Sequence, residues 1–128
     1  MNYGFVKVAA AVPHVQVADC FYNIQQMEGL MRQASDKGVQ IIAFPEMSVT
    51  AYTCLDLFAQ QTLLKNAEQA LLKLVSDTAD LNILTIAGAP LVTENRLINA
   101  AIAFQSGKIL GVVPKTYIPN YKEFQEQR

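Results

Sequence analysis

The sequence predicts an α/β fold built on a mixed β-sheet with two main helices. Two short apolar runs, Phe5–Val12 and Val39–Phe44, flank a segment with a helical repeat, which is the pattern of a β-α-β unit. Further along the chain, Ser106 and Gly107 separate two more apolar runs by a short connection, which is typical of a β-hairpin. Parallel pairing near the start and antiparallel pairing near the end together make the predicted sheet a mixed one.

Composition limits the classes of protein to consider. The 128 residues fit one domain that is large enough to bury a core. Hydrophobic residues make up 52% and charged residues 16%, so we expect some apolar surface to be covered by more chain or by another subunit. The net charge is −1, and Lys and Arg are scattered, which argues against nucleic-acid binding.

The sequence also shows no sign of a membrane segment or of secretion. No apolar window approaches the roughly 20 residues that span a bilayer. The N-terminal residues lack the basic and apolar regions of a signal peptide. The two cysteines, Cys20 and Cys54, are too few for a disulfide framework. We therefore expect a cytoplasmic protein with no membrane partner.

The first predicted strand ends at Pro13, and a helix follows it. Asp19 can cap this helix. Its apolar face is predicted from residues at three- and four-residue steps: Phe21, Ile24, Met27, Leu30, Met31 and Ala34. Lys37 and Gly38 end the helix, because a cation suits the last turn and glycine suits the residue after it. The second strand begins at once, so it should run parallel to the first.

The second half of the chain predicts one more helix and three more strands. The helix is indicated by apolar residues with the helical period: Leu57, Phe58, Leu63, Leu64, Ala67, Ala70, Leu71, Leu74 and Val75. The third strand is expected over Leu81–Ala87 and should be broken by Gly88–Pro90. The fourth and fifth strands, Leu97–Phe104 and Lys108–Val113, should each reverse direction. The second and fifth strands then end at the same edge of the sheet.

Those two strands end in the same way, with an apolar residue, a proline and a charged residue. Phe44-Pro45-Glu46 ends the second strand, and Val113-Pro114-Lys115 ends the fifth. Open α/β sheets place their chemistry at the carboxyl ends of strands. We therefore expect Glu46 and Lys115 to lie close together, Glu46 as a base and Lys115 supporting a developing oxyanion. An ordinary ion pair at the sheet edge is the alternative.

Other reactive side chains are few. A zinc site is not expected, because the chain has one histidine, His14. Cys54 could act as a nucleophile near Glu46, and Cys20 lies at a predicted helix N-terminus. Packing is the favoured role of both, since free cysteines commonly behave as small buried hydrophobes.

The two strand ends and the residues around them resemble a known family. Phe44-Pro45-Glu46, Thr50-Ala51-Tyr52 and the segment Gly111–Tyr121 are similar to motifs of the carbon–nitrogen hydrolase (nitrilase) superfamily. Within it, Ala51–Phe58 and Lys115–Tyr121 most resemble the glutaminase domains of glutamine-dependent NAD synthetases. The likeness covers Val6 to Arg128. It implies that residues 1–128 are the N-terminal portion of such a domain, an incomplete αββα sandwich, with the synthetase domain absent.

The resemblance also implies a Glu–Lys–Cys triad. Glu46 matches its general base, and Lys115 matches the lysine that stabilises the tetrahedral intermediate. The cysteine of the family attacks the amide carbon of glutamine, forms a thioester and releases ammonia. The amidase part then needs no cofactor, whereas ATP and deamido-NAD would be substrates of the absent synthetase domain.

The same resemblance implies a glutamine pocket. Tyr52 and Tyr121 match residues that line it in similar proteins. Glu126 matches the further carboxylate that many family members place after the lysine, and Glu123 is a rival for that position. Superfamily membership also implies a homo-oligomer.

The sequence departs from the family in one respect. The family's nucleophilic cysteine lies beyond the lysine, after a further strand, and this sequence stops before that point at Arg128. Because a covalent acyl-enzyme needs the thiol, we expect the chain alone to be inactive. The alternatives are a non-catalytic remnant or assembly module of this fold, and a fragment of another amidase or nitrilase. Half a sandwich should also expose an apolar sheet face, which favours self-association.

Overall fold

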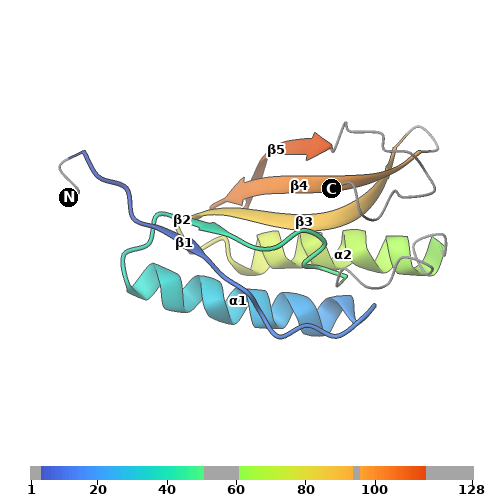
Figure 1. The fold of residues 1–128 in the computed structure, drawn as a ribbon, viewed down its shortest axis with the longest axis horizontal. Coiled ribbons are helices and arrows are strands. Elements are labelled where there is room, and N and C mark those ends of the chain that lie inside the picture. Colours follow the sequence, from blue (N-terminus) through green and yellow to red (C-terminus); the bar gives the residue numbers. More distant parts are fainter. Residues whose placement is uncertain (1–3, 51–60, 94–95, 115–128) are drawn as a thin grey trace, which may run out of the picture.

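The computed structural model describes residues 4–50, 61–93 and 96–114. In these residues the chain forms one five-stranded sheet and two helices (Figure 1). The elements in chain order are β1 (Val8–Ala10), α1 (Cys20–Asp36), β2 (Ile41–Ala43), α2 (Gln61–Asp77), β3 (Leu84–Thr93), β4 (Arg96–Gln105) and β5 (Lys108–Pro114). The predicted α/β fold with a mixed sheet is therefore confirmed.

The strands lie in the sheet in the same order as in the sequence. β1, β2 and β3 are parallel, whereas β4 is antiparallel to β3 and β5 is antiparallel to β4. β5 therefore runs in the same direction as β2, as the sequence predicts. β3 and β4 separate the two, which corresponds to roughly 14 Å between their axes at the usual strand spacing.

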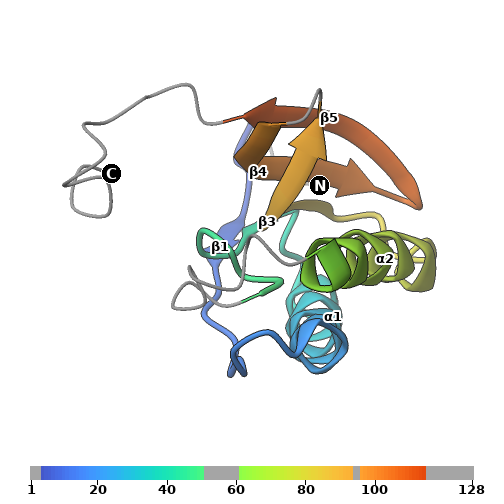
Figure 2. The ribbon, with the colours of Figure 1, turned by 90° about the vertical axis from the view of Figure 1, so that its right-hand side faces the viewer.

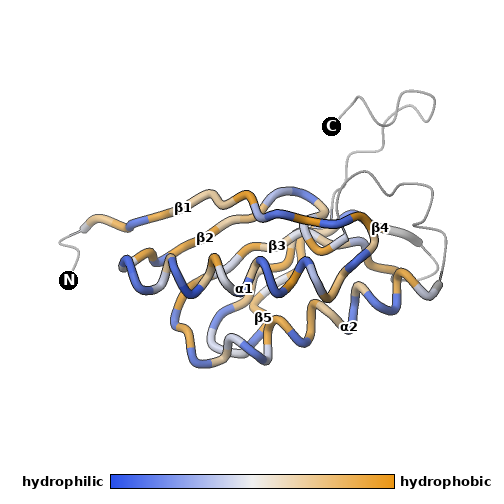
Figure 3. The backbone as a smooth tube through the Cα atoms, turned by 90° about the horizontal axis from the view of Figure 1, so that it is seen from below, coloured by the Kyte–Doolittle hydropathy of each residue, from blue (hydrophilic) through white to orange (hydrophobic). Residues whose placement is uncertain are grey.

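α1 begins where the sequence predicts. The carboxylate of Asp19 accepts a hydrogen bond from the backbone N–H of Tyr22 at 3.2 Å, which caps the first turn. After the helix, Gly38 has φ +80°, a conformation that glycine adopts without strain. The buried stripe of α1 consists of Cys20, Asn23, Ile24, Met27, Met31 and Ala34. Figure 3 shows the resulting alternation of apolar and polar residues along the helix.

The prediction of the apolar face of α1 was wrong for one residue, Phe21. Phe21 is 40% exposed, while Cys20 beside it is 2% exposed. The buried stripe begins at Cys20 and continues to Ile24 and Met27 in steps of four and three residues. Phe21 therefore projects beside this stripe rather than on it. Cys20 packs in the core, which is the role that the sequence favours for it.

Both helices cover the same face of the sheet and lie side by side, as the end-on view in Figure 2 shows. α2 begins at Gln61, and Leu57 and Phe58, predicted for this helix, lie outside the described residues. The buried residues of α2 are Leu63, Ala67, Ala70, Leu71, Leu74 and Val75. They pack with helix-facing residues of the sheet, among them Ile42, Ile102 and Phe104, to form one hydrophobic core. No helix in the described part of the chain is long and apolar enough to cross a membrane.

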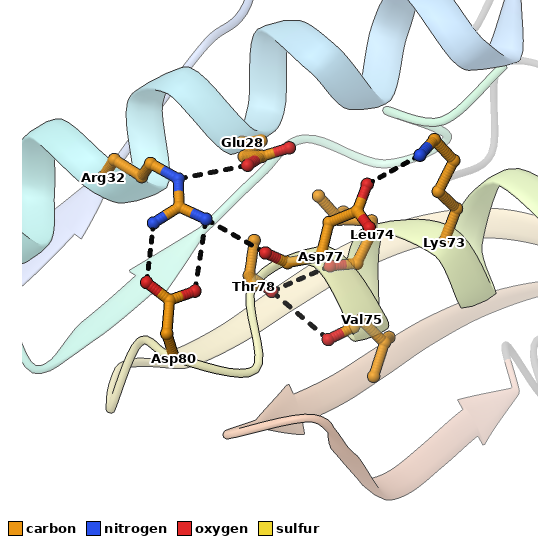
Figure 4. A network of polar contacts seen from close by, with 8 residues as sticks. All are labelled: Glu28, Arg32, Lys73, Leu74, Val75, Asp77, Thr78 and Asp80. Atoms are coloured by element: carbon orange, nitrogen blue, oxygen red, sulfur yellow. Dashed lines mark hydrogen bonds and ion pairs between the residues drawn. The ribbon is translucent and has the colours of Figure 1, made fainter.

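Four polar and charged residues join α1 to the end of α2 (Figure 4). The Arg32 guanidinium contacts the Glu28 carboxylate at 3.0 Å and the Asp80 carboxylate at 2.9 Å, and it donates to the carbonyl of Asp77 at 2.9 Å. The hydrogen bond from Arg32 is the largest cause that lowers the pKa of Asp80. The same bond is the largest cause that raises the pKa of Arg32. The network is exposed, so it fixes the relative placement of the helices more than it adds stability.

β3 is longer than the sequence predicts, because Gly88, Ala89 and Pro90 do not end it. The strand continues to Thr93, and Pro90 pairs with Asn99 of β4. The prediction was wrong because it counted glycine and proline as breakers without knowing which way their backbone groups face.

The direction of the β3 backbone groups explains why a proline fits there. The carbonyl of Ile86 accepts from Phe44 N–H at 2.9 Å, and that of Gly88 accepts from Val49 N–H at 3.0 Å. Backbone groups alternate in direction along a strand, so every second residue of β3 faces away from β4. Pro90 belongs to this set. Because its backbone nitrogen faces away from β4, the missing N–H of Pro90 removes no hydrogen bond from the ladder between β3 and β4.

Among the described residues, no helix or strand covers the face of the sheet opposite the helices (Figure 2), and this open face is apolar. Val8 in β1 is 64% exposed and Val113 in β5 is 66% exposed. Between them on the same face lie Ile41, Ile86 and Ala101, according to the strand register. The apolar open face that the sequence predicts is therefore present, whereas self-association stays a prediction.

Candidate active site

The loop that follows β2 carries Glu46 across the end of the shorter strand and over β3. It is a run of tight turns, in which Ser48 N–H donates to the Pro45 carbonyl at 3.2 Å. Two further bonds hold it on β3: Val49 N–H donates to the Gly88 carbonyl at 3.0 Å, and Gly88 N–H donates to the Ser48 hydroxyl at 3.2 Å. Because β2 ends at Ala43 and β3 continues, the loop has room to cross.

This crossing depends on the absence of a side chain at position 88. A Cβ atom placed on Gly88 would lie 2.5 Å from the backbone nitrogen of Met47 and 3.0 Å from the carbonyl oxygen of Pro45. Both are backbone atoms, so no side chain can turn aside to make room. Met47 itself has φ +58°, which is uncommon for a residue other than glycine. The two observations show that the backbone around Glu46 is tightly fixed.

α1 supports the same loop from the other side. The amide of Asn23, which has no exposed surface, donates to the Val49 carbonyl at 2.9 Å. It also donates to the carbonyl of Gln16 at 2.9 Å and accepts from the N–H of Gln16 at 2.7 Å. A buried amide with its donors and acceptor satisfied holds its partners in place. Asn23 thus joins the helix, the segment before it and the Glu46 loop.

Glu46 is exposed at the open face and contacts β4. The side-chain amide of Asn99 donates a hydrogen bond from Nδ2 to Oε2 of Glu46. Asn99 is partly buried and lies opposite Pro90 in the ladder. The loop therefore carries Glu46 from the end of β2, past β3, to β4.

The end of β5 reaches the same place. Pro114 pairs with Ala100, the residue after Asn99. A cavity of about 290 Å³ is lined by Glu46, Asn99 and Val113, together with small residues of β3 and β4. The loop after β2 therefore brings Glu46 to the same cavity as the end of β5, at the edge of the sheet where both strands end. The closeness of Glu46 and Lys115 stays a prediction. Lys115 itself lies just outside the described residues.

Several predicted residues cannot be placed. Tyr52, Tyr121 and Glu126, predicted to bind substrate, lie outside the described residues. The same is true of Glu123 and Cys54. Their roles remain predictions from the resemblance.

A larger cavity, of about 690 Å³, lies on the other side of the sheet. It is formed between α2 and the ends of β3, β4 and β5, and is lined by Leu64, Leu91 and Ile98, with Lys65 and Glu68 of the helix. It does not include Glu46. We assign the candidate site to the smaller cavity, because the Glu46 carboxylate lies there beside the end of β5.

Among the described residues, the lining of the smaller cavity includes a carboxylate that could act as a base, that of Glu46, but no cysteine that could act as a nucleophile. A carboxylate facing an open cavity can accept a proton from a group placed beside it. The one cysteine of the described residues, Cys20, is buried in the core beneath the sheet. The described parts of the chain also contain no group of three or more His, Cys, Asp or Glu residues that could hold a metal ion.

Sequence reasoning missed three residues that shape this site: Gly88, Asn23 and Asn99. Asn99 carried a signal, since it is the one polar residue within the apolar run Leu97–Phe104. In the sequence, Gly88 indicates the end of a strand, and nothing shows that another segment approaches it closely. Asn23 gave no signal, because an asparagine on a predicted helix is usually a solvated residue.

Comparison with known proteins gives the family. A family model described as carbon–nitrogen hydrolase matches residues 7–128. The chain belongs to the carbon–nitrogen hydrolase family. This confirms the resemblance given by the two strand ends, with their Pro45-Glu46 and Pro114-Lys115 sequences.

Relatives of this carbon–nitrogen hydrolase chain are glutamine-dependent NAD(+) synthetases. That of Mycobacterium tuberculosis is 40% identical over 127 residues, which is 99% of this chain and 19% of the relative. That of Aquifex aeolicus is 33% identical over 112 residues, or 88% of this chain and 19% of the relative. The chain thus spans about a fifth of the length of the curated relatives it matches.

Solved structures show the same fold. A glutamine-dependent NAD(+) synthetase from Cytophaga hutchinsonii superposes with a TM-score of 0.81 at 21% identity, over 90% of this chain and 20% of that one. The enzyme from Acinetobacter baumannii gives 0.69 at 30% identity, over 91% and 21%. An amidase from Nesterenkonia gives 0.73 at 18% identity, over 90% and 44%. The nitrilase-like fold is therefore established for this carbon–nitrogen hydrolase chain.

Proposed function

We propose that residues 1–128 are the first part of a cytoplasmic glutamine amidohydrolase that supplies ammonia for the amidation of deamido-NAD. The observation that carries the proposal is the meeting of Glu46 with the end of β5 at one open cavity. The relatives named above support glutamine as the substrate, because they are glutamine-dependent NAD(+) synthetases.

In the proposed reaction, Glu46 acts as the general base. It accepts the proton of a cysteine thiol, and the thiolate attacks the amide carbon of glutamine. Lys115 stabilises the oxyanion of the tetrahedral intermediate. Ammonia leaves with the proton that Glu46 returns, and water then hydrolyses the thioester to glutamate. Tyr52, Tyr121 and Glu126 bind the substrate.

The nucleophile of this reaction is not Cys20, because that thiol is buried in the core. Cys54 lies outside the described residues, and the sequence favours packing as its role. We therefore place the nucleophile in another segment and expect residues 1–128 alone to release no ammonia from glutamine above the uncatalysed rate. Ammonia release coupled to glutamate dehydrogenase measures this. Release at an enzymatic rate by these residues alone would overturn the assignment of the nucleophile to another segment.

Reading the gene past codon 128 tests the origin of the nucleophile. A continuing frame with a cysteine after a further strand, followed by an ATP-binding domain, is expected. A stop codon at that point would instead favour a non-catalytic remnant.

The role of Glu46 is tested in the complete gene product. Glu46→Gln keeps the shape of the side chain but removes the base, so kcat for glutamine hydrolysis should fall by about 100-fold or more. Glu68→Gln, which changes an exposed carboxylate on α2, is the matched control and should leave kcat unchanged. Full activity of Glu46→Gln would refute the proposed base.

A further inference from the structure

We propose that Asn99 is a positioning residue for Glu46, whose side-chain amide holds the carboxylate in the orientation needed for proton transfer. This inference rests on the proposed function of Glu46 as a base. The observation is the hydrogen bond from Asn99 Nδ2 to Glu46 Oε2. It links a loop residue to a residue of β4 that is 53 positions away in the sequence.

Glu46 needs such a partner because of where it lies. It is an exposed side chain with several rotatable bonds, placed on a loop at an open face of the sheet. A proton is transferred efficiently only when donor and acceptor are held in alignment. The backbone of the loop is fixed by Gly88 and Asn23, but these contacts do not orient the carboxylate. The contact with Asn99 acts on the carboxylate itself.

The chemical type of residue 99 suits this task. An amide N–H can donate to a carboxylate, and it does not gain or lose a proton over the range in which a carboxylate does. It therefore holds Glu46 without adding a full positive charge to the site. An aspartate of the same shape would supply no donor and would place a like charge beside Glu46.

β4 is also the right element to provide the contact. It lies between β3 and β5, so it is held by a ladder on each side. Asn99 contacts Glu46, and the next residue, Ala100, pairs with Pro114, which directly precedes Lys115. One interior strand thus sets the position of Glu46 relative to the chain that leads to the predicted lysine. Sites built on strands are more precise than sites built on loops alone.

Three variants separate the hydrogen bond from a structural role. Asn99→Ala removes the side chain, Asn99→Asp keeps its shape but not its donor, and Asn99→Ser offers a shorter donor. The matched control is Gln105→Ala. Gln105 lies on the same face of β4 and donates a side-chain amide hydrogen bond at 2.9 Å, but to Asn82 at the far end of the strand.

In the complete gene product, Asn99→Ala should lower kcat for glutamine by about 100-fold, with KM and Tm close to those of the unchanged protein. Asn99→Asp should be at least as harmful, and Asn99→Ser should recover part of the loss. Gln105→Ala should change none of these. If Asn99→Asp keeps full kcat, the shape of the residue and not its donor is what matters, and the proposal is wrong.

A second readout does not depend on activity. In isotope-labelled residues 1–128, NMR follows the side-chain amide signal of Asn99, which is assigned by its loss in Asn99→Ala. Glu46→Gln should shift this signal, and Gln105→Ala should not. If the chemical shift of the Asn99 amide is the same with and without Glu46→Gln, the contact does not exist and the proposal is wrong. A shifted signal in a gene product without glutaminase activity would leave the contact standing and refute the proposed function instead.

Discussion

Glu46 is positioned by residues whose own side chains are small or neutral. Gly88 lets the loop pass, Asn23 holds the loop from α1, and Asn99 contacts the carboxylate. The Pro-Glu sequence after an apolar run pointed to Glu46, because a strand that ends in proline and charge is a recognisable pattern. Its role as a base stays a prediction. These supporting residues could not be predicted with it, since their roles arise from contacts between segments that are far apart in the sequence.

Gly88→Ala tests the close approach of the loop to β3. The new methyl group would meet backbone atoms of Met47 and Pro45, so either the loop or the strand must move. We expect the free energy of unfolding to fall by about 1–3 kcal/mol, as measured by urea denaturation.

Gly29→Ala is the control for this change. Gly29 lies within α1, and an added Cβ would meet no atom within 4 Å apart from the neighbouring backbone of its own helix. Alanine favours the helix over glycine, so this variant should gain about 0.5–1 kcal/mol. Equal effects of the two substitutions would show that the approach at Gly88 is looser than described.

At the scale of elements, the sequence predicted all five strands and both helices but not where every one of them ends. The apolar repeats located α1 and α2 because packing against one sheet face imposes a helical period. The predicted end of β3 was wrong because pairing with β4 outweighs the local effect of Pro90. Such pairing is a property of two strands together, and neither sequence alone encodes it.

The link between α1 and the end of α2 should respond to pH. Arg32 holds the pKa of Asp80 below its ordinary value of 3.8. A lowered pKa means that the contribution to stability is present above the ordinary pKa, and is lost as pH falls through the pKa of the folded protein. Asp80→Asn should therefore lower Tm at neutral pH. Its difference from the unchanged protein should shrink as pH falls below 3.8 and vanish once pH is below the lowered pKa of Asp80 in the folded protein.

Thermal unfolding followed by circular dichroism across the acid range checks this expectation. Glu68→Gln serves again as the control, because it removes an exposed carboxylate of α2 away from Arg32. A Tm difference for Asp80→Asn that stays constant into acid would show that the ion pair contributes nothing.

For the molecule as a whole, the arrangement is two layers: helices on one face of the sheet, and an open apolar face on the other (Figure 2). The composition predicted an uncovered apolar surface, because 52% hydrophobic residues is a high share for a chain whose whole surface faces water. The open face also carries the contact between Glu46 and Asn99. A partner that covers the apolar part would enclose the site and exclude water from it.

Residues 1–128 in isolation should self-associate through this face. Val8→Lys places a charge on an exposed position of β1 and should reduce the association measured by light scattering at high concentration. Leu72→Lys is the control, because Leu72 is exposed on α2, in the layer of helices. A monomer at all concentrations, or equal effects of both variants, would contradict the expectation.

The order of the strands also bears on how the protein folds. Each strand pairs with the strand before it in the sequence. Every new strand can therefore join a sheet that already exists, and no strand has to be inserted between two others. During synthesis the sheet can grow from β1 towards β5. Glu46 leaves the ribosome early, but its partner on β4 comes 53 residues later. The Glu46 carboxylate can thus contact Asn99 only near the end of this sequence of events.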